Sequence, residues 1–413
     1  MRILFLNSVF PGRFRSLAQF FGMSGEHTVI FLAETGQRES LPGIRRLRLA
    51  PPREHASPDP AEVEIVTRLR RGARVGNALL ALRKDGFVPD LICAPAGMGG
   101  SFYIRDIFPE AFYVACGDWF YARDESHTFF TRGKPRPPAD FALGRVCNLW
   151  EYNALDACDL ALTASDWQRE QYPELIAHRM SVVRDGINTR YFFPDPGARL
   201  RDVGGLPTPG KNDPPRELVT FCGPLHDAAR GFACFRQCLP HLLAARPRCH
   251  VAVAWLGRGK GEGGGRESGG VKDFADLAPE FRTRVHMQGA LSLNGYRTLL
   301  QASTAHVYLA APHTFSTGLL EAMACGGLVL GSDTPPVREV IRHGINGFLC
   351  DFWDSRQMAD TLAGMLNMAP RLEPVRQEAR RNMVEHYDIK TQTKRLADLI
   401  CERMEGRNAG HHG

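Results

Sequence analysis

The chain has 413 residues, of which 44% are hydrophobic and 23% charged, and its formal net charge is +6. A chain of this length is expected to form about two domains, and its composition is ordinary for a globular protein. The charge is too small to indicate nucleic-acid binding. The absence of an apolar run of about 18 residues excludes a transmembrane helix, and the N-terminus lacks the features of a signal peptide.

Short apolar runs alternate with helical patterns along the chain. The first series of predicted strands comprises Ile3–Leu6, Thr28–Leu32, Leu91–Ala94, Phe112–Cys116 and Leu160–Thr163. The second series comprises Leu218–Cys222, His250–Leu256, Val285–Gln288, Ala305–Leu309 and Leu328–Leu330. Because a turn or a helical segment follows each run, the alternation predicts an α/β protein with parallel sheets built from βαβ units.

The two series are separated by a segment rich in proline and glycine, a composition that opposes regular structure and is typical of a linker. We therefore predict an N-terminal domain over residues 1–195, a linker over 196–215 and a C-terminal domain over 216–385. Residues 386–413 are predicted to form a C-terminal helix and tail. The glycine- and charge-rich segment 258–272 is predicted to be a loop on the second domain.

Cysteine spacing and charge clustering give weaker signals. The eleven cysteines form no CxxC pair and no zinc-ligand spacing, so we expect buried free thiols, a reducing cytoplasm and no metal site. The basic residues cluster at Arg45, Arg46, Arg48 and Arg53, and again at Arg68, Arg70, Arg71, Arg74, Arg83 and Lys84. Such clusters attract anionic lipid or a phosphorylated ligand, although a charge run is more often a solvated helix face.

The most informative run of the chain is residues 315–347. The small-residue turn Ser316–Gly318 begins a short helix that carries Glu321, and an apolar strand and a second turn follow. The free N–H groups at a helix start suit a phosphate, and a carboxylate one turn further on can accept from both hydroxyls of a ribose. The run therefore predicts a site for a nucleoside diphosphate.

This run resembles the donor-binding segment of the retaining GT-B glycosyltransferases, specifically the group 1 transferases of glycosyltransferase family 4. Three further stretches resemble blocks of that family in its order, namely Met1–Arg15, Val182–Phe192 and Arg230–Phe232. The resemblance covers nearly the whole chain. It implies a GT-B fold, in which two Rossmann-like domains with parallel sheets face a central cleft, and a last helix that packs back on the N-terminal domain.

The resemblance also implies the activity. A retaining, metal-independent transferase of the hexosyl type (EC 2.4) would move a sugar from a UDP- or GDP-sugar to an acceptor, with no further cofactor. The acceptor would be a glycan, a lipid-linked sugar, a protein or a small molecule, and nucleic acid would not be a partner. A cytoplasmic location, with peripheral membrane contact as an option, is the corresponding expectation.

The donor-side residues follow from the local chemistry and the resemblance. Glu321 would recognise the ribose, and Arg230 would reach the diphosphate. Ser316, Thr317 and Gly318 would present N–H groups to the phosphates. As alternatives, Glu321 is a capping or solvent-exposed helix glutamate, the Ser316–Gly318 turn is an ordinary N-cap, and Arg230 is a surface arginine. The donor-binding candidates are Gly12, Arg230, Ser316, Thr317, Gly318, Leu319 and Glu321.

The acceptor-side candidates lie in loops at predicted strand ends. Arg13 follows Gly12, Gly99 and Gly100 lie in a glycine-rich loop, and Asp118 stands near the place where many family members carry a histidine. Both glycine-containing loops can equally be simple turns. The aromatic residues 119–121 would stack on a sugar ring or, as is more common, belong to the core. The catalytic candidates are Asp118, His313 and Glu321.

Two positions depart from the family pattern. His313 stands where the family carries a second glutamate eight residues before Glu321, and Pro224 stands where an arginine often follows Gly223. Histidine can still donate a hydrogen bond, but proline cannot. These departures keep open a non-catalytic GT-B scaffold or partner subunit as the alternative. No GxGxxG motif begins either domain, which argues against a dinucleotide dehydrogenase.

Overall fold

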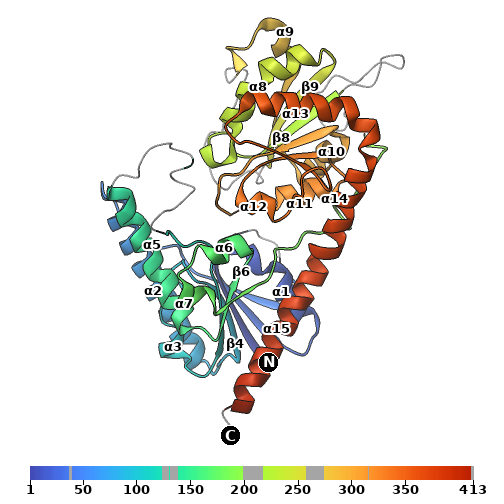
Figure 1. Cartoon of the computed structure of the whole chain (residues 1–413). Helices are drawn as coiled ribbons and strands as arrows, with labels where there is room; N and C mark the ends of the chain where they lie inside the picture. The colour runs from blue at the N-terminus through green and yellow to red at the C-terminus, as the bar shows by residue number, and fades with distance from the viewer. Residues whose placement is uncertain are drawn as a thin grey trace. The chain divides into compact units, whose positions relative to one another are not determined.

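The computed structural model describes residues 1–36, 40–122, 130, 138–198, 217–256, 274–314 and 316–410. The chain divides into two compact units (Figure 1). The first unit comprises Met1–Gly186 and Ile389–Gly413, and the second comprises Ile187–Asp388.

The first unit is built on a seven-stranded sheet in the order β3-β2-β1-β4-β5-β6-β7. All neighbouring strands of this sheet are parallel. The strands are β1 (Arg2–Phe10), β2 (Thr28–Gly36), β3 (Ile44–Arg48), β4 (Leu91–Pro95), β5 (Phe112–Cys116), β6 (Leu160–Thr163) and β7 (Met180–Val182). The central strands β4 and β5 are buried along their whole length, which explains why their sequences are continuous apolar runs.

Helices cover both faces of this sheet, as Figure 1 shows. One face carries α2 (Pro60–Lys84), α3 (Ile104–Ile107) and α5 (Pro138–Ala157), and the other carries α1 (Arg15–Met23) and α15 (Ile389–Gly410). The shorter helices of the unit are η1 (Gly12–Phe14), α6 (Asp166–Glu170) and α7 (Glu174–Ala177). Ala397 and Ile400 of α15 belong to the same core cluster as the β1 residue Phe5, so the C-terminal helix completes the first unit.

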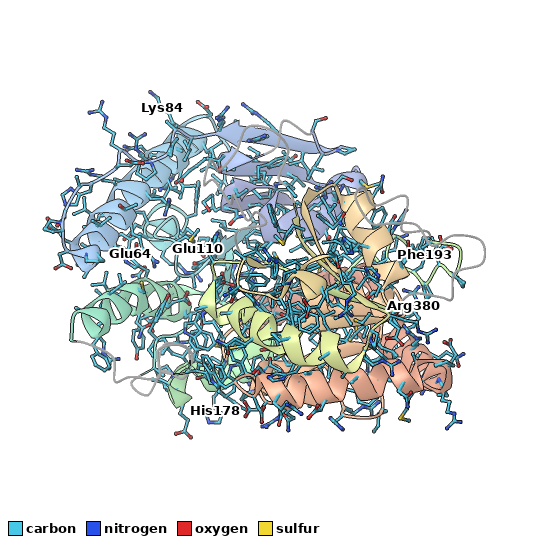
Figure 2. All side chains as sticks on the ribbon, turned by 90° about the horizontal axis from the view of Figure 1, so that it is seen from above. Glu64, Lys84, Glu110, His178, Phe193 and Arg380 are labelled. Carbon is cyan, nitrogen blue, oxygen red and sulfur yellow. The ribbon has the colours of Figure 1, made fainter. Side chains whose placement is uncertain are left out.

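Helix α2 illustrates how local sequence sets an element. Asp59 caps its N-terminus by accepting from the Ala61 N–H at 2.9 Å, and Pro60 occupies the first helical position. Figure 2 labels Glu64 and Lys84 near the two ends of this helix. Its buried positions, including Val75 and Leu79, recur at helical spacing and pack on the sheet.

The second unit is built on a six-stranded parallel sheet in the order β10-β9-β8-β11-β12-β13. The strands are β8 (Glu217–Cys222), β9 (Cys249–Leu256), β10 (Val285–Leu291), β11 (Ala305–Tyr308), β12 (Val329–Ser332) and β13 (Phe348–Cys350). The helices are η3 (Ala228–Arg230), α8 (Phe232–Ala245), α9 (Pro279–Arg282), α10 (Leu293–Ala302), α11 (Gly318–Ala324), α12 (Pro335–Arg338), α13 (Ser355–Met368), η5 (Ala369–Arg371) and α14 (Glu373–His386). Residues of α10, α11 and α14 share one core cluster.

The strand order determines where each sheet can bind a ligand. In both sheets the chain winds outward in one direction from the first strand of the unit and then in the other. The direction changes between β1 and β4 in the first sheet and between β8 and β11 in the second. Open parallel sheets bind ligands beyond the carboxyl ends of the strands at such a switch point. The loops after these four strands are therefore the places to look for a site.

The fold agrees with the predicted class and differs in detail. Residues 187–195, which the sequence placed in the first domain, belong to the second unit because the Arg380 guanidinium donates to the Thr189 and Phe192 carbonyls at 2.8 and 2.7 Å. Figure 2 labels Arg380 and the neighbouring Phe193. Most of the predicted linker and the loop 258–272 lie outside the described residues. Within the described part of the chain, no helix combines the length and apolarity needed to cross a membrane.

Candidate active site

Glu321 lies on the first turn of α11, with its carboxylate among hydroxyl groups. The Thr317 hydroxyl donates to Glu321 Oε1 at 3.4 Å, and the Tyr296 hydroxyl of α10 lies close to this carboxylate. Burial raises the pKa of Glu321, and the hydroxyls of Tyr296 and Thr317 partly offset that effect. A partly buried carboxylate held in this way can accept hydrogen bonds from a polyol such as a ribose.

Arg230 lies at the end of η3, in the loop after β8, and is held by two groups. Its Nη1 lies 3.4 Å from the Tyr308 hydroxyl at the end of β11, and its Nε lies 3.8 Å from Asp227 Oδ2. The Tyr308 hydroxyl also accepts from the Ser316 N–H at 2.8 Å. Arg230, Tyr308 and Ser316 therefore come together at the switch point of the second sheet, as the topology requires.

The other donor-side candidates divide into groups that can and cannot contact a ligand directly. The Ser316 N–H is engaged by Tyr308, which leaves Thr317 and Gly318 to offer N–H groups at the start of α11. Leu319 is fully buried in the core and its N–H donates to the Ser316 carbonyl at 3.3 Å. The His313 Nδ1 lies 3.1 Å from the Thr314 hydroxyl.

In the first unit, the loop after β1 brings an arginine to an aspartate. Gly12 has φ +48°, and a Cβ at this position would lie 1.9 Å from Asn7 Nδ2, so the turn requires glycine. The next residue, Arg13, donates to Asp118 Oδ1 at 2.7 Å. Desolvation alone would lower the pKa of Arg13, but the nearby Cys116, Asp118 and Asp185 outweigh it and raise that pKa. Asp118 keeps 69% of its side chain exposed and so remains accessible to a ligand.

Two buried amide side chains hold the backbone around Asp118. Gln168 Nε2 donates to the Asp118 carbonyl at 2.8 Å. Asn148 of α5 accepts from the Tyr121 N–H and donates to the Tyr121 carbonyl, both at 2.9 Å. Trp119 and Phe120 are each 5% exposed, so they belong to the core, the more common of the two interpretations of this aromatic run. Sequence reasoning missed both amide residues, because Asn148 is 27 positions from Tyr121 and Gln168 is 50 positions from Asp118 along the chain.

The second glycine loop borders a small hollow at the carboxyl ends of β1, β2 and β4. Gly100 lines this hollow, whereas Gly99 is buried, and a Cβ there would lie 2.7 Å from the Arg68 carbonyl. The hollow also contains the ion pair between Arg71 Nε and Glu34 Oε1 at 2.7 Å. Glu34 is the last buried residue of β2, and a charged residue at the end of an apolar run was a signal that sequence reasoning missed.

Glu151 is a second buried acid that sequence reasoning missed. It lies on α5, is 4% exposed, and accepts from the Tyr172 hydroxyl at 3.1 Å. Burial raises the pKa of Glu151 to about 8, and the negative charge of Asp118 adds to the shift. Among the described residues, no group of His, Cys, Asp or Glu is placed to hold a metal ion.

Many arginines of the two basic clusters have structural partners within the first unit. Arg46 stacks over the Phe10 ring at 4.4 Å, and Arg83 donates to the Ile107 carbonyl at 3.0 Å. Arg68 and Arg71 form ion pairs with Glu64 and Glu34, and Arg70 donates to two backbone carbonyls. These contacts favour a structural role for a large part of the cluster.

Several curated proteins are similar to part of this chain. D-inositol 3-phosphate glycosyltransferase of Thermobispora bispora is 27% identical over 264 residues, covering 62% of this chain and 59% of the relative. Phosphatidyl-myo-inositol mannosyltransferase of Mycolicibacterium smegmatis is 30% identical over 209 residues, covering 50% of this chain and 47% of the relative. The matches thus extend over roughly half to three fifths of these relatives' length.

Solved structures resemble the chain over almost its entire length. Sucrose-phosphate synthase from Thermosynechococcus elongatus has a TM-score of 0.72 at 15% identity, with 98% of this chain and 100% of that chain covered. Anabaena HepE in complex with UDP and glucose has a TM-score of 0.69 at 15% identity, with 97% and 99% covered. At this identity the likeness establishes the fold, which is GT-B.

Two family models match successive parts of the sequence. The model described as glycosyl transferase family 4 group matches residues 25–192, and the model described as glycosyl transferases group 1 matches residues 216–368. Together they take in most of the chain: the first match contains β2 to β7 of the first sheet, and the second contains all six strands of the second sheet. The chain therefore belongs to the group 1, family 4 glycosyltransferases.

Proposed function

We propose that this protein is a retaining, metal-independent glycosyltransferase that moves a hexosyl group from a UDP- or GDP-sugar to an acceptor. The observation that carries the proposal is Glu321, a partly buried carboxylate at the start of α11 that accepts from the Thr317 hydroxyl and lies close to the Tyr296 hydroxyl. Its place in the family's motif supports a ribose-binding role. The structural neighbour HepE, described as a complex with UDP-glucose, supports a nucleotide-sugar donor.

The donor's diphosphate is assigned to Arg230 and to the N–H groups of Thr317 and Gly318. The bond that breaks joins the sugar to the diphosphate, so negative charge grows on the leaving oxygen. A guanidinium stabilises such charge through directional hydrogen bonds. Arg230 is already oriented by Tyr308 and Asp227, which reduces the reorganisation that binding requires.

We assign the acceptor to the first unit. Asp118 is exposed, adjoins Arg13, and has its backbone held by Gln168, so it can accept a hydrogen bond from an acceptor hydroxyl. The loop of Gly99 and Gly100 borders the small hollow that contains Glu34 and Arg71, and we assign this loop to the acceptor side as well. Glycans, lipid-linked sugars, proteins and small molecules remain acceptor classes for this proposal.

The proposed location is the cytoplasm, with peripheral membrane contact as an option. All eleven cysteines are free thiols, as a reducing compartment favours. The exposed cations Arg45, Arg48 and Lys84 and the half-buried Arg74 supply positive charge for contact with an anionic membrane surface. Sedimentation with phosphatidylserine vesicles at low and high salt tests the membrane option, because electrostatic binding weakens as salt is added.

Nucleotide titration tests the donor assignment. Glu321→Ala is expected to weaken UDP- or GDP-sugar binding by roughly 1–3 kcal/mol, the scale of a lost hydrogen bond to a charged group. Glu385→Ala, which changes an exposed glutamate of the same unit, is the matched control and should bind as the unchanged protein does. Equal dissociation constants for the Glu321→Ala and unchanged proteins would refute the ribose assignment.

A non-catalytic scaffold or partner subunit is the second candidate. His313 in place of the family's second glutamate, and Pro224 in place of an arginine, favour it. The two candidates differ in turnover: the enzyme slowly hydrolyses its own sugar nucleotide or transfers to an acceptor extract, whereas the scaffold releases no nucleoside diphosphate. Measuring UDP and GDP release from a panel of sugar nucleotides separates them.

A further inference from the structure

Two tyrosine hydroxyls lie beneath the proposed donor site. Tyr296, on α10, is 3% exposed, and its hydroxyl lies beside Gly318 in the first turn of α11, close to Glu321. Tyr308, at the end of β11, is 5% exposed and bonds through its hydroxyl to the Ser316 N–H and to Arg230. The two rings are too deeply buried to offer much surface to a ligand, so any influence on the donor passes through the residues that their hydroxyls contact.

Tyr308 connects two segments that are distant in sequence. Its hydroxyl lies 2.8 Å from the Ser316 nitrogen, 3.4 Å from Ser316 Oγ and 3.4 Å from Arg230 Nη1. The backbone supports the same connection, because the Ala311 N–H donates to the Ala229 carbonyl at 2.8 Å. Tyr308 therefore fixes the Arg230 guanidinium relative to the turn that begins α11.

Tyr296 faces a different group. Its hydroxyl lies against the first turn of α11, which carries Glu321, and a Cβ at Gly318 would lie 3.3 Å from that hydroxyl. Burial raises the pKa of Tyr296 well above its ordinary value, so the hydroxyl stays protonated and can donate to the nearby Glu321 carboxylate. Thr317 supplies a second hydroxyl, which donates to Glu321 Oε1 at 3.4 Å.

We propose that Tyr296 and Tyr308 are positioning residues that serve separate halves of the donor: Tyr296 orients Glu321 for the nucleoside, and Tyr308 orients Arg230 and the Ser316 turn for the diphosphate. This inference rests on the proposed function, because it requires a nucleoside diphosphate at this site. Neither tyrosine is assigned a direct contact with the donor.

The separate roles of Tyr296 and Tyr308 have a measurable consequence for nucleotide binding. The ratio of the dissociation constants of UMP and UDP reports what the second phosphate contributes to binding, and GMP and GDP give the same ratio for a guanine donor. Tyr308→Phe removes the hydroxyl and keeps the ring, so it should weaken UDP binding roughly tenfold, the scale of one hydrogen bond to a charged group, and lower the ratio. Tyr296→Phe should weaken both nucleotides by a similar factor and leave the ratio unchanged.

Isothermal titration of the full chain with these four nucleotides tests the proposal. Tyr191→Phe is the matched control, because it removes a tyrosine hydroxyl bond to Asn294 in the same unit and should change neither affinity nor ratio. Arg230→Gln should lower the ratio as Tyr308→Phe does, and the double variant should lose less than the sum of the two single losses.

Several outcomes would overturn the inference. An unchanged ratio in Tyr308→Phe, additive losses in the double variant, or a lowered ratio in Tyr296→Phe would each do so. If Tyr308→Phe fails to fold, the ratio of dissociation constants measured for Tyr296→Phe still tests the proposal. If the unchanged protein binds none of the four nucleotides, the proposed function fails first and this inference fails with it, whereas binding without the expected ratios refutes the inference only.

Discussion

The pH dependence of stability offers a direct test of the buried carboxyl Glu151. Its pKa is raised from 4.5 to about 8, first by burial and then by the charge of Asp118, whereas Tyr172, Arg68 and Arg13 act in the opposite direction. The folded protein therefore keeps the proton up to about pH 8, while the unfolded chain releases it near its ordinary pKa. Between these values the folded state binds more protons, so the free energy of unfolding falls as pH rises.

The size of the effect follows from the width of that pH window. Each pH unit inside it corresponds to about 1.4 kcal/mol, so the contribution of Glu151 falls by about 3 kcal/mol between pH 5 and pH 7.5. Glu151→Gln removes the titration and keeps an oxygen that can accept from the Tyr172 hydroxyl. The variant should therefore gain stability relative to the unchanged protein as pH rises.

Urea unfolding at intervals from pH 5 to pH 8 measures this difference. Glu110→Gln changes an exposed glutamate of the same unit, which Figure 2 labels, and its unfolding free energies should run parallel to those of the unchanged protein. Parallel curves for Glu151→Gln would mean that Glu151 is ionised in the folded state throughout the range. That result would refute the argument from burial.

Three further predictions concern single contacts. Arg71→Ala leaves the carboxylate of Glu34 buried without its ion-pair partner and should lower the free energy of unfolding by roughly 3–5 kcal/mol, measured by urea unfolding; a loss below about 1 kcal/mol would show that the carboxylate finds water instead. Gly12→Ala forces a Cβ against Asn7 at a positive φ and should destabilise by roughly 1–3 kcal/mol in the same assay, whereas a neutral result would mean that the turn rearranges freely. Arg230→Ala should weaken UDP binding more than UMP binding in a calorimetric titration, and equal losses would remove the phosphate assignment.

The strands were predictable where burial is complete on both faces of a sheet. Phe112–Cys116 and Leu160–Thr163 match β5 and β6 residue for residue, because both strands are continuous apolar runs. Both edge strands of the first sheet were missed, for different reasons. β3 has the sequence IRRLR and was interpreted only as part of a basic cluster, and β7 is three residues long. At an edge, hydrogen bonding to one neighbour replaces the apolar signal.

Site residues were predictable where the chemistry is local in sequence. Glu321 and the turn before it lie within six residues, so their pattern can be recognised without knowing the fold. The supporting groups cannot be found in this way, because Tyr308 meets Arg230 at a separation of 78 residues and Tyr172 meets Glu151 at 21. A tyrosine in an apolar segment has the same sequence signature whether or not its hydroxyl has a functional partner.

The structure also changes which measurements can separate an enzyme from a scaffold. The departures at His313 and Pro224 leave the surroundings of Glu321 and Arg230 in place, since Thr317 donates to Glu321, with Tyr296 close by, and Tyr308 contacts Arg230. Nucleotide binding depends on Glu321 and Arg230 under the proposed function, so a chain that had lost only turnover would still bind UDP or GDP. A positive binding result would therefore support the site and leave catalysis undecided. Release of nucleoside diphosphate from a sugar nucleotide, abolished in Glu321→Ala and retained in Glu385→Ala, is the result that requires an enzyme.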